Sequence, residues 1–264
     1  MAMFDLKNKT AVVFGGSRGI GRATAILLAE CGCNVYVASK SKKSLDDLES
    51  FLSKNNYKVR TITCDVSNEK DVENVINKAV EETKSLDIVI NNAGIVSITP
   101  YLETDSEELR TLVNTNIYGV DNGAKLAIKK MIELGIEGKI VNIASIEGRH
   151  ATFDGYPYYG MTKASVIYLT QAQALAAAKY NINVNCVCPG IIRTDMWEKI
   201  LDDYEKRGYE REEMFKNMIN TYIPLKRGSQ KPEDIAYTIV FLSSKYADNI
   251  TGQSINVDGG EVLN

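Results

Sequence analysis

Histidine and tryptophan are almost missing from this chain of 264 residues, because each occurs once, as His150 and Trp197. A Cys/His zinc site needs several such ligands at close spacing, and no C-x-x-C pair occurs either. The sequence therefore predicts no metal site. The cysteines are odd in number and lie mostly in apolar, strand-like runs, so we expect reduced, buried thiols at Cys31, Cys33, Cys64, Cys186 and Cys188.

Long hydrophobic runs are missing as well. The longest apolar runs have the length of a strand and residues 1–9 lack an apolar core, so we expect neither a signal peptide nor a membrane span. Neither sign of charge dominates, since 31 basic and 34 acidic residues are interspersed and give a net charge of -3. This balance argues against nucleic acid or a membrane as partner and favours a cytoplasmic protein that acts on a small molecule.

Strand-like and helix-like runs alternate along the chain. The composition, 44% hydrophobic and 25% charged, suits one globular domain over residues 1–264. The alternation predicts an α/β fold, a doubly wound parallel sheet of about seven strands with helices on both faces. We expect strands at 10–14, 34–38, 58–63, 86–90, 138–144, 182–187 and 254–257. The expected helices lie at 19–31, 42–55, 68–84, 104–132, 158–180 and 231–244, with Asn68 and either Asp105 or Ser106 as N-caps.

Residues 195–222 interrupt this alternation. The segment lies between Pro189-Gly190 and Pro224 and carries more apolar residues than an exposed loop would, including Met196 and Trp197. We interpret it as a helical lid, whose apolar residues line a substrate pocket or pack against one another.

A glycine-rich turn follows the first expected strand. It reads Gly15-Gly16-Ser17-Arg18-Gly19-Ile20-Gly21 and leads into an expected helix. Glycines at 15, 19 and 21 permit a tight turn and a close approach of the backbone to a pyrophosphate at the helix N-terminus. The order strand, glycine turn, helix is typical of a dinucleotide site.

The end of the second expected strand bears on which dinucleotide binds. An acidic residue there would favour the ribose hydroxyls of NAD, but the chain has Ser39-Lys40. A hydroxyl and an ammonium group attract the 2′-phosphate of NADP, and Arg18 adds positive charge. We therefore favour NADP(H) as the cofactor, with NAD(H) as the alternative.

Tyr159 and Lys163 stand four residues apart, after Ser145. On a helix they share one face, so the ammonium group can lie near the phenol. A free phenol has a pKa of about 10 and is a poor base at neutral pH, so we expect Lys163 to lower the pKa of Tyr159. Ser145 can hold the substrate oxygen. This combination predicts proton transfer to or from a carbonyl or alcohol.

Together with further motifs, these segments resemble the short-chain dehydrogenase/reductase family, from Lys9 to the C-terminus, with its Rossmann-type fold. The motifs that carry the resemblance, beside the glycine turn and the Tyr159/Lys163 pair, are Asp65-Val66, Asn91-Asn92-Ala93-Gly94, Asn116-Ile117-Tyr118-Gly119, Pro189-Gly190 with Thr194, and Asp258-Gly259-Gly260.

The resemblance implies a role for each matching position. Ser145 orients the substrate oxygen, Tyr159 is the acid/base and Lys163 also holds the nicotinamide ribose, while Asn116 supports a proton-relay water. The implied cofactor contacts are the glycine-turn residues Gly15, Ser17, Arg18, Gly19, Ile20 and Gly21, with Ser39, Lys40, Asp65, Val66, Asn92, Ala93, Gly94, Tyr159, Lys163, Pro189, Gly190, Ile192 and Thr194. Substrate contacts are expected from Ser145, Glu147, His150, Tyr156, Met196 and Trp197.

The substrate is left open between two classes. The runs 188–197 and 258–264 are similar to those of acetoin, diacetyl and polyol dehydrogenases, which take small hydroxyketones and diols. An apolar lid with Arg149 and His150 near its mouth suits a hydroxysteroid or bile acid instead. A 3-oxoacyl-carrier-protein reductase and a catalytically silent NADP-binding regulator are further alternatives. The resemblance also implies a homotetramer, formed through helices 104–132 and 158–180 and the C-terminal strand region.

Overall fold

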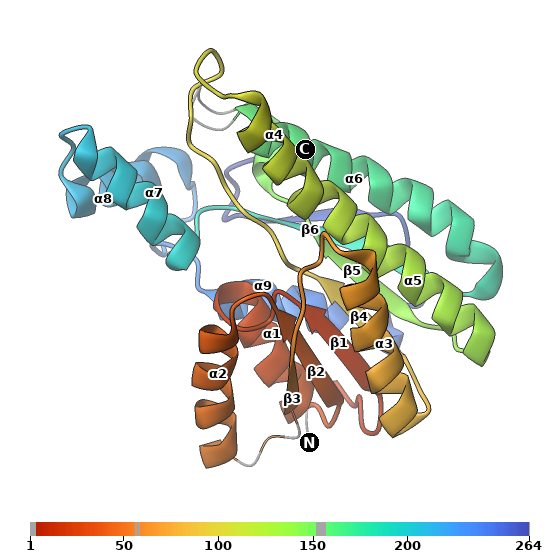
Figure 1. Ribbon diagram of the computed structural model, residues 1–264. Coiled ribbons are helices and arrows are strands. Elements are labelled where there is room, and N and C mark those ends of the chain that lie inside the picture. The colour runs from red at the N-terminus through yellow and green to blue at the C-terminus, as the bar shows by residue number, and fades with distance from the viewer. Residues whose placement is uncertain (1–3, 56, 58, 152–156, 264) are drawn as a thin grey trace.

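A seven-stranded parallel sheet forms the centre of the computed structural model, which describes residues 4–55, 57, 59–151 and 157–263 (Figure 1). The strand order within these residues is β3-β2-β1-β4-β5-β6-β7, and every neighbouring pair is parallel. The strands are β1 (Thr10–Phe14), β2 (Asn34–Ser39), β3 (Val59–Thr63), β4 (Ile88–Asn91), β5 (Lys139–Ile143), β6 (Asn183–Pro189) and β7 (Ser254–Val257). The predicted fold class is confirmed. The bounds of β1 and β7 are as predicted, and the other five strands differ from their expected bounds by one or two residues at one or both ends.

Helices cover both faces of the sheet. On one face lie α1 (Gly19–Glu30), α2 (Lys42–Asn55) and α9 (Pro232–Leu242). On the other lie α3 (Glu69–Thr83), α5 (Gly119–Leu134) and α6 (Pro157–Ala177), followed by a short 3-10 turn at Ala178–Tyr180. Figure 1 shows α5 and α6 side by side, with α4 (Ser106–Val113) leading into α5.

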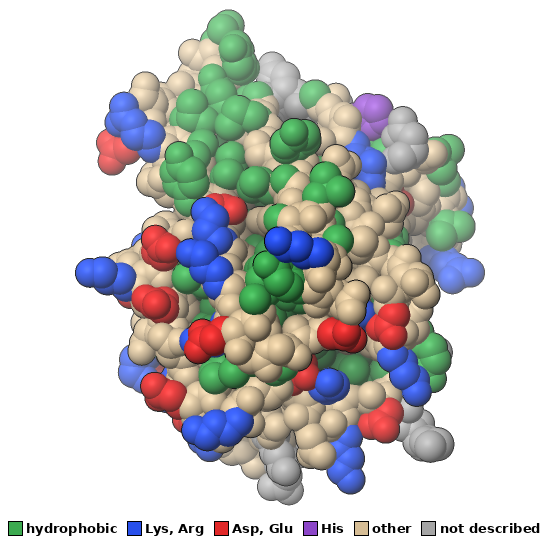
Figure 2. Space-filling model, turned by 90° about the vertical axis from the view of Figure 1, so that its right-hand side faces the viewer, with side chains coloured by type: hydrophobic (Ala, Val, Ile, Leu, Met, Phe, Trp, Pro, Cys, Tyr) green, Lys and Arg blue, Asp and Glu red, His purple; other side chains and the backbone are tan. Residues whose placement is uncertain are grey.

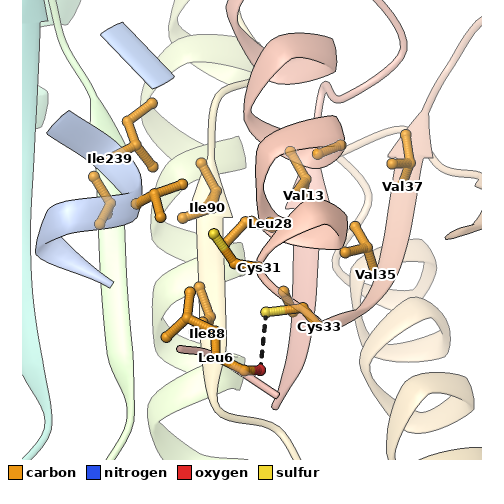
Figure 3. Packing of buried hydrophobic residues seen from close by; sticks show 14 of the residues in the cluster. Leu6, Val13, Leu28, Cys31, Cys33, Val35, Val37, Ile88, Ile90 and Ile239 are labelled. Carbon is orange, nitrogen blue, oxygen red and sulfur yellow. Dashed lines mark hydrogen bonds between the residues drawn. The ribbon is translucent and has the colours of Figure 1, made fainter. Parts of the chain in front are cut away.

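The apolar strand residues explain the two covered faces, because successive side chains point to opposite sides of a sheet. Val13 and Val37 belong to the core beneath α1, α2 and α9, whereas Val12 and Tyr36 belong to the core beneath α3 and α5. Figure 3 shows the first of these cores, in which the Cys33 thiol donates to the Leu6 carbonyl oxygen at 3.6 Å. All five cysteines are buried free thiols, as predicted.

Helix starts follow the predicted caps. The side chain of Asn68 accepts a hydrogen bond from the Lys70 backbone amide, and that of Asp105 accepts from Glu107 and Glu108. The single helix expected over 104–132 is divided, however, because a π-helical turn at Asn114–Tyr118 separates α4 from α5. The buried Asn116 side chain lies in this turn and bonds the backbone of Ile95, a contact that the helical pattern of the sequence does not reveal.

The predicted helical lid consists of two helices, α7 (Asp195–Lys206) and α8 (Arg211–Tyr222), which project from one side of the molecule in Figure 1. Part of its apolar surface packs internally, since the rings of Trp197 and Phe215 meet edge to face at 5.7 Å. Salt bridges of Arg193 and Arg211 with acidic residues of both helices hold α7 against α8. No helix in the described part of the chain has the length and apolarity to cross a membrane.

Candidate active site

The carboxyl ends of the parallel strands bring the predicted motifs together. The glycine turn follows β1, Asn92 to Gly94 follow β4, Ser145 follows β5 and Pro189 ends β6. In an open α/β sheet, ligands bind beside this edge, where the strand order reverses between β1 and β4. A pocket opens here, and the predicted residues that line it are Ile20, Asn92, Gly94, Ser145, Glu147, Tyr159, Lys163, Pro189, Gly190, Ile192, Thr194, Met196 and Trp197.

Ser145 and Tyr159 are joined by a hydrogen bond between their side chains. Ser145 is buried at the start of a 3-10 turn, Ile146–Gly148, which its hydroxyl caps by accepting from the Glu147 amide at 3.2 Å. Tyr159 lies in the first turns of α6, so its phenol reaches the serine from the neighbouring element. The pair can hold one substrate oxygen between a hydroxyl and a phenol.

The pKa of Tyr159 differs from the sequence expectation. It is raised to about 12: burial is the largest cause, the hydrogen bond from Ser145 lowers the pKa, and nearby Glu147 and Cys188 raise it. The ammonium group of Lys163 donates to the Ile143 carbonyl oxygen at 2.9 Å and lies 5.6 Å from the centre of the tyrosine ring. Burial also lowers the pKa of Lys163, to about 8. The expected lowering of the tyrosine pKa is wrong for this structure, because the cost of burying a charged phenolate dominates.

The side chains of Asn116 and Lys163 both lie next to Gly94. A Cβ atom on Gly94 would lie 3.4 Å from both the Asn116 Oδ1 and the Lys163 Nζ atom. The Asn116 amide donates to the Ile95 carbonyl at 2.9 Å and to the Thr162 hydroxyl at 3.0 Å, and its Oδ1 atom accepts from the Ile95 amide at 2.9 Å. These bonds fix the turn after β4 against α6, so Asn116 has an evident structural role beside its predicted catalytic one.

The glycine turn has the shape that a pyrophosphate requires. Gly15 and Gly19 adopt φ values of 74° and 53°, and a Cβ atom on Gly21 would lie 2.3 Å from the Gly15 carbonyl oxygen. The Asn92 side chain donates to that carbonyl at 2.7 Å and fixes the turn. The N-terminus of α1 has no side-chain cap and no acidic residue in its first turn. Its first amide groups and its dipole therefore suit a phosphate, and the turn fits a dinucleotide.

Two predicted cofactor cations are paired within the chain. The Lys40 ammonium lies 2.7 Å from the Asp65 carboxylate, and Arg18 lies 3.4 Å from Asp195. Ser39 accepts a hydrogen bond of 2.9 Å from Ser17. The sequence reasoning missed both ion pairs because their partners are distant in the chain, and the pairs are exposed, where such contacts are weak.

The predicted adenine contacts also have local roles. The Asp65 carboxylate accepts hydrogen bonds from the backbone amide and the hydroxyl group of Ser67. Burial alone would raise the pKa of Asp65, but these bonds, together with the contact to Lys40, leave it below its usual value. Val66 is buried against Gly119, where a Cβ atom would lie 2.6 Å from the valine Cγ2 atom. Ala93 packs over the glycine turn, 2.6 Å from the position of a Cβ atom on Gly15. Contacts of Asp65, Val66 and Ala93 with a cofactor stay predictions.

Some predicted substrate residues do not reach the pocket. His150 is exposed and is not among the lining residues. Arg149 donates to the Ser254 carbonyl at 2.6 Å and to the Asn256 side chain at 2.7 Å, so it ties the turn after β5 to β7 instead of facing an anionic substrate. This corrects its expected place at the lid mouth. Tyr156 lies outside the described residues.

The sequence reasoning also missed several residues that line the pocket. They are Val96, Ile143, Ala144, Ile191 and Glu261. Ile146, Ile200 and Met218 also line the pocket, and they lie in the two segments, after Ser145 and in the lid, from which substrate contacts are expected. The sequence feature that could have placed Glu261 in the pocket is the Asp258-Gly259-Gly260 turn, because it can reverse the chain after the last strand. The described residues contain no group of three His, Cys, Asp or Glu side chains placed to hold a metal ion.

Comparisons with known proteins agree with this geometry. A family model described as enoyl-(acyl carrier protein) reductase matches residues 15–261. A diacetyl reductase [(S)-acetoin forming] from Staphylococcus epidermidis is 36% identical over 257 residues, covering 97% of this chain and 99% of the relative. A 3-oxoacyl-[acyl-carrier-protein] reductase from Thermotoga maritima is 33% identical, covering 98% and 99%.

A solved structure has nearly the same fold. An actinorhodin polyketide ketoreductase variant crystallised with NADPH superposes with a TM-score of 0.90 at 30% identity, covering 96% of this chain and 97% of the other. These relatives are matched over almost their whole length, and the names of all of them describe reductases. The chain therefore belongs to the short-chain dehydrogenase/reductase family of oxidoreductases.

Proposed function

We propose that this enzyme interconverts a small, neutral ketone or hydroxyketone with the corresponding secondary alcohol, with NADP(H) as cofactor. The observation that carries the proposal is the hydrogen-bonded pair of Ser145 and Tyr159 in a pocket that the lid residues Met196 and Trp197 also line. When bound, the nicotinamide supplies or accepts a hydride.

The protein side chains handle the substrate oxygen and its proton. Ser145 donates a hydrogen bond that orients the oxygen, and Tyr159 transfers the proton at its phenol oxygen. With a pKa raised to about 12, Tyr159 is a neutral phenol at physiological pH and thus a proton donor, as ketone reduction requires. Lys163 would hold the nicotinamide ribose with its ammonium group, which also donates to the Ile143 carbonyl, and Asn116 fixes the backbone beside it.

The pocket favours a small uncharged substrate. Its lid side is apolar, formed by Met196, Trp197, Ile200 and Met218, and the only lysine or arginine among its lining residues is Lys163. A bile acid or an acyl carrier protein would bring an anionic group, and the described residues that line the pocket include no arginine to bind it. The similarity to a diacetyl reductase supports the same substrate class.

NADP(H) is preferred over NAD(H) because no acidic residue ends β2. Ser39 stands there, and Lys40, whose side chain is 81% exposed, can move from Asp65 to a 2′-phosphate at little cost. The ketoreductase that shares the fold was crystallised with NADPH.

Three alternatives receive less support. The activity of a 3-oxoacyl-carrier-protein reductase is supported by a relative with that name, whose 33% identity is close to the 36% of the diacetyl reductase. A hydroxysteroid dehydrogenase loses its expected anion site because Arg149 is bound to β7. A silent NADP-binding regulator would have no need of the Ser145–Tyr159 pair beside Lys163.

A substrate panel tests the proposal. Consumption of NADPH and of NADH is followed with diacetyl, acetoin, a 3-oxoacyl thioester and a keto bile acid. We expect turnover of diacetyl and acetoin with NADPH preferred. Turnover confined to the bile acid or the thioester would overturn the substrate class, equal rates with NADH would overturn the cofactor preference, and no turnover at all would favour the silent regulator.

We further propose that the protein is a homotetramer that resides in the cytoplasm. Figure 2 views the side on which α5 and α6 lie in Figure 1, and hydrophobic side chains gather in the upper half of that face. On α6, Met161, Tyr168 and Leu175 are exposed at intervals of seven residues, so they form one apolar stripe. A second copy of the chain is the partner proposed for this stripe.

A further inference from the structure

The turn after β7 directs one more carboxyl group into the pocket. The Asp258 carboxylate accepts hydrogen bonds from the amides of Gly260 at 3.0 Å and Val262 at 2.8 Å, and Asn256 donates to the Val262 carbonyl at 2.9 Å. Glu261 lies between these anchored residues and lines the pocket with Ser145 and Tyr159. Its position is therefore set by the fold.

The same turn contacts the end of the lid. Gly259 has a φ of 71°, and a Cβ atom there would lie 2.6 Å from the Cγ2 atom of Ile223, the residue that follows α8. The Leu225 amide also donates to the Gly259 carbonyl at 3.1 Å. Glu261 consequently enters the pocket at the point where the lid joins the sheet.

One oxygen of Glu261 lacks a partner. Its Oε2 atom is buried and has no hydrogen-bond partner in the described part of the chain. Burial, with the negative charges of Glu147 and Asp258, raises the pKa of Glu261 to about 7. A buried polar atom without a partner is costly, so a donor group on a ligand in this pocket would be bound favourably.

The charges around the pocket favour a donor and disfavour an anion. Glu147, Lys163 and Glu261 are its charged lining residues, so two carboxyl groups stand against one ammonium group, which also donates to the Ile143 carbonyl. An ionised substrate carboxylate would face two carboxyl groups, whereas a hydroxyl group could donate to either.

We propose that Glu261 determines substrate specificity: it accepts a hydrogen bond from a hydroxyl group vicinal to the reacting carbonyl, and it repels ketones that carry a carboxylate. This inference rests on the proposed function, because it concerns the same pocket and the same reaction. The substrate class it selects is a neutral hydroxyketone or vicinal diol.

Three ketones of similar size separate the two effects. Acetoin carries the vicinal hydroxyl, 2-butanone lacks it, and 2-oxobutanoate has a carboxylate in its place. Wild-type enzyme should show the highest kcat/KM with acetoin and the lowest with 2-oxobutanoate. Glu261→Leu removes the acceptor and should reduce the preference for acetoin over 2-butanone about tenfold. Glu261→Gln removes only the charge and should raise relative activity on 2-oxobutanoate about tenfold.

The pH dependence distinguishes a direct role from a structural one. As pH falls from 8 to 6, Glu261 becomes protonated, so wild-type discrimination against 2-oxobutanoate should weaken. Glu147, Asp258, Tyr159 and Lys163 lie near the same pocket or act on Glu261. They remain in Glu261→Gln, where Lys163, with a pKa lowered to about 8, still titrates in this range. If Glu261 is the responsible group, discrimination by this variant should change much less between pH 8 and 6 than that of the wild type.

Controls make each result decisive. Glu213→Gln, at an exposed position on α8, should leave both ratios unchanged. NADPH binding, followed by fluorescence, verifies that each variant is folded. Unchanged substrate ratios in both folded Glu261 variants would overturn the inference alone. A wild-type enzyme that reduces no ketone at all would overturn the proposed function, and the inference with it.

Discussion

At the scale of single residues, the protonation state of Tyr159 determines whether it can donate a proton, as ketone reduction requires, or accept one, as alcohol oxidation requires. Its pKa is raised to about 12, so the phenol keeps its proton at neutral pH, and Lys163 begins to lose its own proton near pH 8. Between pH 6 and 7 both groups are protonated. Reduction, which uses the neutral phenol, should be flat over this range, whereas alcohol oxidation, which uses the phenolate, should rise by up to about tenfold per pH unit.

Replacement of Tyr159 tests this assignment. Tyr159→Phe removes the proton donor but keeps the ring, so kcat should fall by at least about 100-fold. NADPH affinity should change little, because the phenol is not expected to hold the phosphates. Tyr158→Phe, at the adjacent position, serves as the matched control. Normal turnover in Tyr159→Phe would show that another group transfers the proton.

At this scale, the sequence predicted which side chains form the site better than it predicted their pKa values and ion-pair partners. The motif spacing brought Ser145, Tyr159 and Lys163 into one pocket, as the structure shows. It did not predict that burial would raise the tyrosine pKa, or that Lys40 would contact Asp65. Both depend on groups that are close only in the folded chain.

At the scale of elements, the lid depends on charges that join its two helices. Arg211 of α8 binds Glu198 and Asp202 of α7, and Arg193 binds Glu198 and Glu212. These groups are all partly exposed to solvent, so salt should screen their attraction. The ion pairs therefore stabilise one arrangement of α7 and α8 in a manner that depends on ionic strength.

Arg211→Met should loosen the lid and raise KM for the ketone about threefold, with a smaller effect on kcat. Wild-type KM should rise with added salt, and the variant should be less sensitive to it. Arg227→Met, which removes an exposed arginine outside the lid helices, provides the control. If KM is equal in wild type and Arg211→Met at low salt, the ion pairs do not position the lid.

At the scale of the whole molecule, the exposed apolar stripe of α6 bears on assembly. Leu175 is 82% and Tyr168 72% exposed, a high exposure for large apolar groups on one helix face. A contact with a second copy would bury both side chains.

Leu175→Glu places a charge in this stripe and should shift the protein to a smaller species, as measured by light scattering. Lys216→Glu adds the same acidic group on α8 and should leave the mass unchanged. A wild-type protein with the mass of one chain would rule out the tetramer, and a tetramer unaffected by Leu175→Glu would place the interface elsewhere.

The sequence by itself determined the parallel sheet, the glycine turn and the Ser145, Tyr159 and Lys163 set, because strand periodicity and motif spacing are local properties of the chain. Only the tertiary structure decided the π-helical turn at Asn116, the binding of Arg149 to β7, and the entry of Glu261 into the pocket. Each arises where segments distant in the sequence meet. Burial and pKa also follow from that packing, since they depend on all the neighbours of a group and not on its position in a motif.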